Sequence, residues 1–539
     1  MIFASRLGLA ALSGVLYAVA FPDAGLSLLV FVSLAPLLAA LRDAGPRRSA
    51  LLAFVHGVFA FGIGIFWIRE VSLPGLFLLV AILSLYTALF GALSSLASGM
   101  RPALRIPVVS LVWIACDALR LHLFSGFPFL FPAYALYEHL PLIQAADLAG
   151  FEGISFAVLA TNALVEEAVH AARGRGRGRA FPLGAAAALV PLALFLYGTI
   201  RLAGLDLETG PRCLAVQPNV PQGAKHDSMS ASEIWRSQVL LTMEGMRAAG
   251  PVDLVSWAET MYPFRIDDNR PEEKARSLAL LGGDVARRHG TSFLVGANAI
   301  GAGDADDRSY SHRAYNRAYL FDSAGELKGT YDKQHLVPSG EFVPLRGYLP
   351  FQDAIDDYVA SVNGFFPNLT AGEETTVFEI PTRSGPRRFA ALICYESLFP
   401  YLSREARRGG ADFLVNISND GWWRGSSQLE QCVAISAFRA VETRMAVFRA
   451  TNTGVSCWID PRGAVRERLV RGGIDREVAG TLFADLEICA SVPPAVAVGG
   501  YFAPVAGGLG VLAAALSYWG FRRRRPKDAV TTKPPRPRD

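Results

Sequence analysis

Long apolar blocks follow one another through the first part of the chain, from Leu7 to about Leu202. Each block is close to the roughly 20 apolar residues that a helix needs to cross a bilayer. One more block of this kind follows a long polar region. The pattern predicts a polytopic α-helical membrane bundle of about eight spans, which lie near residues 7–21, 24–41, 50–68, 74–98, 106–123, 152–171, 181–201 and 501–521.

Arginines in the connections between these blocks test the predicted topology independently. In short loops, arginine and lysine gather on the cytoplasmic side of a membrane. We therefore expect both termini on the cytoplasmic side and the long polar region on the outer face. The arginine-rich connections precede the first block and follow the second, fourth, sixth and eighth blocks, as Arg6, "RDAGPRRS", "GMRPALR", "RGRGRGR" and "RRRRPK".

The polar region between the seventh and eighth blocks has a different pattern of apolar and polar residues. Short β-branched runs, which predict strands, alternate with polar stretches that predict helices. This alternation predicts an α/β layered domain with both sheet faces covered. The expected strands are 213–219, 252–259, 292–299, 317–322, 389–396, 412–418 and 447–452, and the expected helices are 231–248, 271–289, 398–408 and 427–445. We divide the chain into a membrane domain (1–203), an α/β domain (204–498) and a last transmembrane helix with a basic cytoplasmic tail (499–539).

Composition supports a membrane protein and disfavours several other classes. Hydrophobic residues make up 51% of the 539 residues, more than is typical of a soluble enzyme. The formal net charge of +4 is small for this length, so nothing indicates a nucleic-acid partner. Six cysteines without a Cys-x-x-Cys pair form neither a zinc framework nor a disulfide scaffold, and we predict no metal or other cofactor. One disulfide in an oxidising outer compartment remains an alternative.

Two charged residues lie inside the fifth apolar block. Asp117 and Arg120 are three residues apart and share one face of a helix. A charge near the centre of a bilayer costs about 3 kcal/mol on insertion scales, so the two side chains should pair or face the bundle interior. The aromatic, proline-rich stretch 125–144 that follows should lie at the membrane interface, where it could border the access route of a lipid.

Three residues with reactive side chains end predicted strands or runs. Glu259 ends "VDLVSWAE", Lys333 ends "ELKGTYDK" and Cys394 ends "FAALIC". Sites in α/β sheets gather beyond the carboxyl ends of strands, so we expect these side chains to converge. Taken one by one, each has a structural alternative: a solvated loop glutamate, a surface lysine and a buried core cysteine.

Together, these side-chain types suit nucleophilic catalysis by a thiol. A free thiol has a pKa of about 8.5 and is mostly protonated at neutral pH, so it needs a base, a cation, or both. A carboxylate whose pKa is raised by burial could take the proton, and an ammonium could stabilise the thiolate and the tetrahedral oxyanion. The usual alternative is a Cys-His pair, but His335 is the only histidine near these motifs, and we expect a solvated or structural role for it.

The sequence segments around these residues form long motifs in a fixed order, which is a more specific signal than any single short motif. "LVSWAET", "YDKQHLVPSGEFVP" and "LICYESLFP", in that order, resemble the carbon-nitrogen hydrolase (nitrilase) superfamily, which is known for an α-β-β-α sandwich and a Glu-Lys-Cys triad. With the flanking apolar blocks and "GFPF", "QPNVPQ", "NISNDGWW" and "RATNTGVSCWIDPRG", the resemblance narrows to the apolipoprotein N-acyltransferase family and covers nearly the whole chain.

The resemblance assigns roles to named residues. Glu259 looks like the general base, Lys333 the cation that stabilises the oxyanion and Cys394 the nucleophile. It also implies supporting residues: Glu341, which would orient the lysine, and Tyr395 and Glu396 beside the nucleophile.

Some positions depart from the family pattern. His226 stands where the family often has tryptophan, and Asp117 stands where a glutamate is expected. The first departure bears on a lid or a substrate contact and not on the triad. Separately, the segment 340–375 is rich in aromatic and turn residues, and we expect it to form a mobile arm over the site.

The implied reaction has two steps and two lipid substrates. Cys394 takes a fatty acyl chain from a phospholipid and releases a lysophospholipid. It then passes the chain to the α-amino group of a diacylglyceryl-cysteine at the N-terminus of an apolipoprotein. The resemblance thus implies a multi-pass enzyme of the bacterial inner membrane with its catalytic domain on the periplasmic face, and we expect a monomer.

Two alternatives use the same sequence features differently. A membrane-anchored amidase or nitrilase would hydrolyse a small amide or nitrile with the same triad. A non-catalytic membrane receptor or transporter would carry a degenerate α/β domain. The apolar bundle argues against the first alternative, and the intact glutamate, lysine and cysteine argue against the second.

Overall fold

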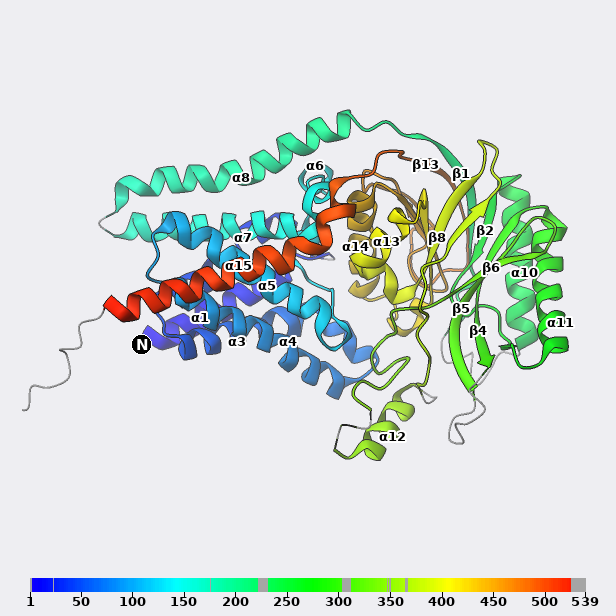
Figure 1. Cartoon of the computed structure of the whole chain (residues 1–539), viewed down its shortest axis with the longest axis horizontal. Helices are drawn as coiled ribbons and strands as arrows, with labels where there is room; N and C mark the ends of the chain where they lie inside the picture. The colour runs from blue at the N-terminus through cyan, green and yellow to red at the C-terminus, as the bar shows by residue number, and fades with distance from the viewer. Residues whose placement is uncertain are drawn as a thin grey trace, which may run out of the picture.

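The computed structural model describes residues 2–22, 24–174, 176–221, 231–302, 312–346, 348, 350–363 and 367–524. His226 and the tail 525–539 lie outside these residues. A helical bundle forms one end of the elongated molecule and an α/β domain forms the other (Figure 1). A helical region and an α/β domain are thus both present, as the hydrophobic pattern predicts, whereas the predicted domain boundaries stay a prediction.

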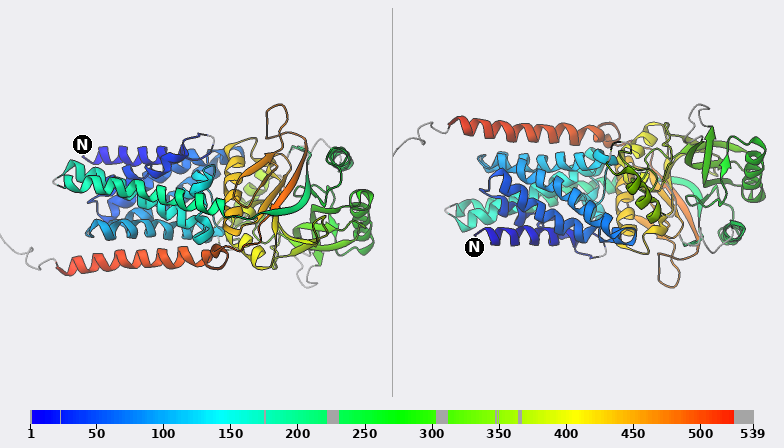
Figure 2. Two further views of the ribbon diagram at one scale, coloured as in Figure 1. Left: turned by 90° about the horizontal axis from the view of Figure 1, so that it is seen from above. Right: turned by 90° about the horizontal axis from the view of Figure 1, so that it is seen from below.

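The bundle consists of helices that run roughly along the long axis of the molecule (Figure 2). Helix α15 lies along the outside of the bundle beside α5 and α7. The bundle elements are α1 (Ile2–Ala18), η1 (Ser27–Phe31), α2 (Ala35–Leu41), α3 (Pro46–Gly64), η2 (Phe66–Glu70), α4 (Leu73–Ser94), η3 (Ser95–Ala97), α5 (Pro102–His122), η4 (Leu123–Ser125), η5 (Pro132–Leu136), α6 (Leu140–Ile143), α7 (Ala146–Arg173), α8 (Arg177–Ala203) and α15 (Pro494–Arg524).

Among the described residues, five helices are long and apolar enough to cross a membrane. The predicted total of eight spans therefore stays a prediction. The five candidates are Leu73–Ala97, Pro102–Ser125, Ala146–Arg173, Arg177–Ala203 and Pro494–Trp519. The last of these begins at Pro494, inside the segment 204–498 that the sequence assigns to the α/β domain.

The span expected near residues 24–41 is interrupted in the structure, because the chain breaks between η1 and α2. The side chain of Asn162 on α7 occupies this break: its Oδ1 accepts hydrogen bonds from Leu34 N at 2.8 Å and Ala35 N at 3.1 Å. Its Nδ2 donates to Val30 O at 2.8 Å. A partner from another helix thus satisfies backbone groups that a broken helix would leave unpaired in an apolar environment.

Asp117 and Arg120 pair inside the bundle, as the sequence predicts. Arg120 Nη2 lies 3.1 Å from Asp117 Oδ1, and both side chains are almost fully buried. Trp113 Nε1 donates to Asp117 Oδ2 at 2.9 Å, and Arg120 Nη1 donates to Phe129 O at 2.5 Å. Because every charge here has a polar partner, the pair is a structural feature of the helical interior.

The α/β domain contains two sheets that pack face to face. The first sheet has the strand order β13-β1-β2-β4-β5-β6, with β3 beside β4, and the second has the order β12-β11-β10-β9-β8-β7. The strands are β1 (Glu208–Gln217), β2 (Leu254–Trp257), β3 (Ile266–Asp267), β4 (Ser292–Ala302), β5 (His312–Phe321), β6 (Leu327–Asp332), β7 (Val377–Ile380), β8 (Arg387–Ile393), β9 (Phe413–Ser418), β10 (Ala446–Thr451), β11 (Cys457–Ile459), β12 (Val465–Arg468) and β13 (Gly480–Ile488).

Side chains on alternate strand positions build the core between the sheets. On β9, Phe413 and Val415 face the first sheet, while Leu414 between them packs with the helical layer. The period of two explains this division, because successive side chains of a strand point to opposite faces. The sandwich core therefore draws on both sheets, as an α-β-β-α arrangement requires.

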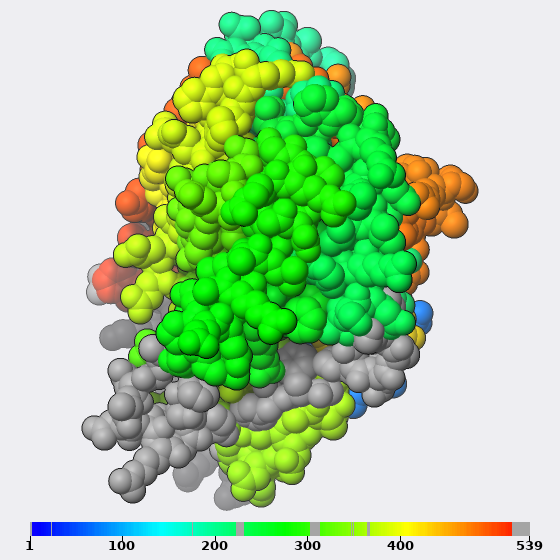
Figure 3. Space-filling view, turned by 90° about the vertical axis from the view of Figure 1, so that its right-hand side faces the viewer, coloured from blue at the N-terminus to red at the C-terminus, as the bar shows by residue number. Residues whose placement is uncertain are grey.

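Helices cover the outer face of each sheet, and the two helical layers have different surroundings. The remaining elements are α10 (Ala231–Ala249), α11 (Pro271–Leu281), η6 (Gly282–Arg287), α12 (Gln352–Asn363), η7 (Cys394–Leu398), α13 (Pro400–Arg408), η8 (Asp420–Trp422) and α14 (Ser427–Thr443). Helices α10 and α11 cover the first sheet at the end farthest from the bundle (green in Figure 3). Helix α14 lies between the second sheet and the bundle and is buried along nearly its whole length.

The segment 340–375 contains α12, which projects away from the sheets beside the bundle (Figure 1). Tyr358 on α12 and Ser72 at the start of α4 are joined by a hydrogen bond of 2.7 Å between their hydroxyl groups. The segment thus touches the bundle end that faces the α/β domain. That it moves as an arm stays a prediction.

Candidate active site

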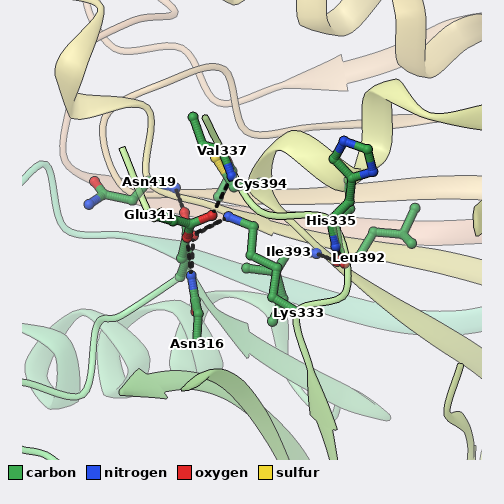
Figure 4. Close-up of polar contacts among 12 residues, drawn as sticks. Asn316, Lys333, His335, Val337, Glu341, Leu392, Ile393, Cys394 and Asn419 are labelled. Carbon is green, nitrogen blue, oxygen red and sulfur yellow. Dashed lines mark hydrogen bonds and ion pairs between the residues drawn. The ribbon is translucent and has the colours of Figure 1, made fainter. Parts of the chain in front are cut away.

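The three residues singled out from the sequence follow the ends of three strands. Glu259 lies just beyond β2, Lys333 directly follows β6 and Cys394 directly follows β8. Strands β2 and β6 belong to the first sheet and β8 to the second, so the site forms between the two sheets. Figure 4 shows Lys333, Glu341 and Cys394 close together, with Asn316 and Asn419 beside them.

A buried ammonium between two carboxylates forms the centre of the site. Lys333 Nζ lies 3.2 Å from Glu259 Oε1 and 2.9 Å from Glu341 Oε1. Lys333 is 1% exposed and Glu259 is 6% exposed, so water hardly screens these contacts. Burial disfavours the charged lysine, but the charges of Glu259 and Glu341 outweigh it and raise the pKa of Lys333 well above its usual value. The lysine therefore stays an ammonium.

Asn316 on β5 holds the two carboxylates together. Its Nδ2 donates to Glu259 Oε1 at 2.6 Å and to Glu341 Oε1 at 3.1 Å. The other oxygen of Glu341 accepts a hydrogen bond from Val337 N at 2.9 Å. Glu341 is therefore placed to orient the lysine, which is the supporting role that the family resemblance implies for it.

The protonation of Glu259 differs from the sequence prediction. Burial alone would raise the pKa of its carboxyl group, as expected, but the Lys333 ammonium and the hydrogen bonds from Asn316 and Asn419 outweigh burial and lower the pKa. The Asn419 backbone N–H donates to Glu259 Oε2 at 2.8 Å. The prediction of a raised pKa is wrong because the sequence does not show which donors surround the carboxylate. Glu259 is therefore ionised at neutral pH.

Cys394 occupies a turn that presents its thiol to the site. Its φ of +53° is in the left-handed region, which non-glycine residues seldom adopt. The residue is partly exposed, unlike the other five cysteines, which are buried, and all six are free. Burial of the sulfur and the charge of Glu259 raise the pKa of the thiol well above its usual value, although Lys333 opposes this shift. Cys394 therefore rests as a thiol and needs a base to become a nucleophile.

Glu396 connects the turn of Cys394 to the segment that follows Lys333. Its Oε2 accepts a hydrogen bond from Ile393 N at 2.7 Å, and its Oε1 accepts from Gln334 N at 2.6 Å and from His335 N at 3.1 Å. Tyr331 Oη also donates to Oε1, at 2.8 Å. Glu396 thus accepts backbone hydrogen bonds from both the segment before Cys394 and the segment after Lys333.

Tyr395, the residue after Cys394, contacts the bundle. Its hydroxyl donates to Gly126 O at 2.9 Å, in the loop that follows α5. The residue next to Cys394 is therefore bonded directly to the helical bundle.

Sequence reasoning missed Asn316 and did not assign a role to Asn419. Asn316 is 2% exposed and lies in the middle of β5, between Tyr315 and Arg317, so its neighbours in the sequence gave no signal of its role. Asn419 belongs to "NISNDGWW", and its backbone N–H donates to Glu259. In the same segment, Ser418 Oγ donates to Asp420 Oδ1 at 2.6 Å, and a hydrogen bond between Ser418 and Cys394 opposes the rise in the pKa of the thiol.

Within the described ranges, no group of three or more histidine, cysteine or acidic side chains is arranged to hold a metal ion. The ion cluster of the site contains its own cation, Lys333, which contacts both carboxylates. The groups present suit proton transfer, attack by sulfur and stabilisation of an oxyanion.

Two family models match the chain. The apolipoprotein N-acyltransferase N-terminal domain matches residues 13–164, and the carbon-nitrogen hydrolase model matches residues 215–488. The second match contains Glu259, Lys333 and Cys394. The two matches correspond to the bundle and to the α/β domain.

Curated relatives match over most of their length. An apolipoprotein N-acyltransferase of Geobacter metallireducens is 34% identical over 471 residues, which cover 85% of this chain and 86% of that protein. One from Bradyrhizobium diazoefficiens is 31% identical and covers 80% of this chain and 75% of that protein. Among solved structures, a nitrilase-superfamily amidase from Nesterenkonia is similar at 17% identity and a TM-score of 0.36, over 51% of this chain and 91% of that one. The chain belongs to the apolipoprotein N-acyltransferase family.

Proposed function

We propose that this N-acyltransferase carries a fatty acyl chain on Cys394 between two membrane-bound substrates. The donor is a phospholipid, and the acceptor is the α-amino group of the diacylglyceryl-cysteine at the N-terminus of an apolipoprotein. The observation that carries the proposal is the arrangement of an ionised Glu259, a buried Lys333 ammonium and a protonated Cys394 thiol. A base, a cation and a nucleophile are what acyl transfer to sulfur needs.

In the first step, the Glu259 carboxylate takes the proton of Cys394, and the sulfur attacks the ester carbonyl of the phospholipid. The tetrahedral oxyanion develops beside Lys333, whose ammonium stabilises it. The C–O bond then breaks, and Glu259 returns the proton to the departing oxygen of the lysophospholipid. The products are a thioester on Cys394 and an ionised Glu259.

In the second step, the neutral α-amine of the acceptor attacks the thioester carbonyl, and Glu259 takes a proton from the nitrogen. The C–S bond breaks, and the sulfur leaves and regains a proton from Glu259. The N-acylated lipoprotein is released with Cys394 again a thiol. Because a thioester stays reactive toward amines, sulfur suits this transfer better than a serine hydroxyl.

The contacts between the site and the bundle support substrates that reside in the membrane. Tyr395, next to the nucleophile, donates to Gly126 O at the end of α5 that faces the α/β domain. The alternation of arginine-rich loops supports an inner-membrane location with both termini cytoplasmic and the α/β domain periplasmic. We also propose that the enzyme acts as a monomer and binds no nucleic acid.

The test is the covalent intermediate itself. The detergent-purified protein is incubated with a phospholipid that carries an isotopically labelled acyl chain, and the Cys394 peptide is analysed by mass spectrometry. We expect one acyl group on Cys394, released by hydroxylamine, and none in Cys394→Ala. Cys432→Ala, which removes a buried cysteine of α14, is the matched control and should keep the adduct. No adduct in the wild-type protein, or normal transfer by Cys394→Ala, would overturn the proposal.

A further inference from the structure

The loop that follows α5 has an unusual backbone. Three consecutive residues are left-handed: Phe124 at φ +52°, Ser125 at φ +67° and Gly126 at φ +74°. A Cβ on Gly126 would lie 2.0 Å from Leu121 O, so this position admits only glycine without a shift of the chain. Left-handed non-glycine residues cost about 1–3 kcal/mol each and persist where surrounding contacts hold them.

Two hydrogen bonds from the α/β domain hold this loop. Tyr395 Oη donates to Gly126 O at 2.9 Å. His335 Nε2 lies 2.8 Å from Ser125 O, and a carbonyl oxygen only accepts, so Nε2 carries the proton. Both donors come from segments that flank residues of the triad.

The rest of the His335 ring is equally constrained. In a neutral ring, Nδ1 is the acceptor, and it receives the hydrogen bond from Tyr401 Oη at 2.9 Å. The ring also stacks on Phe399, with 3.6 Å between ring centroids and 26° between the planes. Burial and the nearby Lys333 charge lower the pKa of His335 to about 4, which keeps the ring neutral. One tautomer thus satisfies every contact.

The backbone of His335 belongs to the segment that positions the site. His335 lies two residues after Lys333, and its N–H donates to Glu396, which also accepts from the residue before Cys394. A shift of the His335 backbone would therefore move Lys333 and the turn of the nucleophile together. The chain of contacts runs from the bundle loop through the imidazole to both reacting groups.

We propose that His335 is a positioning residue, through which the left-handed loop 124–126 of the bundle keeps Lys333 aligned with Cys394. The bundle then takes part in catalysis as well as anchoring the domain. This inference deepens the proposed function and rests on it, since it concerns the alignment of the same site.

The test compares two substitutions in the full-length protein in detergent. His335→Gln can still donate to Ser125 O and accept from Tyr401, whereas His335→Phe keeps the stacking on Phe399 and loses both hydrogen bonds. For His335→Phe we expect about a 10- to 100-fold lower kcat of acyl-enzyme formation with little change in the phospholipid KM, since misalignment of about 1 Å has effects of this size. His335→Gln should stay within a few-fold of the wild type.

A second readout separates alignment from packing. The rate of Cys394 alkylation by iodoacetamide is measured against pH, which reports the ionisation of the thiol in the field of Glu259, Lys333 and Asp420. Since Lys333 lowers the thiol pKa, a displaced lysine should move the profile of His335→Phe to higher pH. His139→Phe is the matched control: it removes a histidine whose Nε2 bonds Ser27 Oγ at 2.7 Å inside the bundle, away from the site, and should leave rate and profile unchanged.

The outcomes separate this inference from the proposed function. A wild-type rate and profile for His335→Phe would overturn the inference, and so would equal losses in His335→Phe and His335→Gln. Absence of the acyl adduct in the wild-type protein would instead overturn the proposed function. Gly126→Ala tests the same contact from the bundle, because the added Cβ must displace the loop 124–126. We expect it to shift the alkylation profile of Cys394 to higher pH, as His335→Phe does.

Discussion

Two buried clusters of three charges make an instructive comparison. In the site, the cation Lys333 lies between the anions Glu259 and Glu341. At the junction of the bundle and the α/β domain, the anion Asp147 lies between the cations Arg444 and Arg201, at 2.7 Å and 2.6 Å. Both clusters join elements that are distant in the sequence, and both are hydrogen-bonded further by neutral side chains.

The difference lies in what borders each cluster. The junction cluster is bordered by Tyr197, which donates to Asp147, and by Gln144, which accepts from Arg444. Each of these contacts only satisfies a buried charge. The site cluster borders Cys394, a partly exposed residue on a left-handed turn. Buried ion pairs alone therefore do not mark a catalytic site; a reactive group placed next to them does.

The largest effect should come from removing the base. Glu259→Gln should lower acyl transfer by about 10⁴-fold, the upper range for general acid-base catalysis, because one residue serves both steps. Alkylation should respond in the opposite direction: the charge of Glu259 raises the thiol pKa, so its loss should move the alkylation profile of Cys394 to lower pH. Alkylation that slows in parallel with acyl transfer would contradict this role.

The matching change at the junction should affect stability and not chemistry. Asp147→Ala leaves the fully buried Arg444 guanidinium without its carboxylate, and breaking a buried pair costs about 3–5 kcal/mol. We expect a lower free energy of unfolding and a lower Tm in detergent. At temperatures where the variant is folded, the alkylation profile of Cys394 should match the wild type; a shifted profile would show that the two clusters are coupled.

A smaller effect should follow the loss of the amide that bridges the two glutamates. Asn316→Ala removes hydrogen bonds to charged oxygens, each worth about 1.5–3 kcal/mol, so acyl transfer should fall by about 30-fold. Because Asn316 helps to lower the pKa of Glu259, its loss should raise that pKa and move the acid limb of the pH-rate profile to higher pH. Asn269→Ala, at an exposed asparagine of the same domain, should leave the profile in place.

The smallest effect should come from replacing Arg201, the partly exposed cation of the junction cluster. The Arg201 side chain is 31% exposed, and Asp147 keeps Arg444 as a partner without it. Arg201→Met should therefore lower the free energy of unfolding by less than about 1 kcal/mol. A loss as large as that of Asp147→Ala would show that Arg201 and not Arg444 is the principal partner.

The sequence predicted those features that depend on local pattern. Short β-branched runs located the strands that precede Glu259 and Cys394, and the spacing of Asp117 and Arg120 predicted their pairing. The side-chain pattern did not reveal that β13 returns to lie beside β1, because such pairing joins residues far apart in the chain.

The sequence did not predict features that depend on side chains or backbone groups far away in the chain. Asn162, which occupies the break between η1 and α2, comes from a helix more than a hundred residues later. Likewise, the lowered pKa of Glu259 results from Lys333, Asn316 and Asn419, and no periodicity shows that these meet at one carboxylate. The sequence thus predicted many of the elements and proposed the reacting groups, whereas the protonation states of these groups required the structure.

A single-turnover chase tests most directly that the sulfur carries the chain between the two substrates. Acyl-enzyme labelled on Cys394 is freed of phospholipid and mixed with a synthetic diacylglyceryl-cysteine peptide, and both species are followed by mass spectrometry. We expect the label to leave Cys394 and to appear on the peptide α-nitrogen at the same rate and in equal amount. Label that stays on Cys394, or that is released as free fatty acid while the peptide remains unmodified, would contradict the transfer.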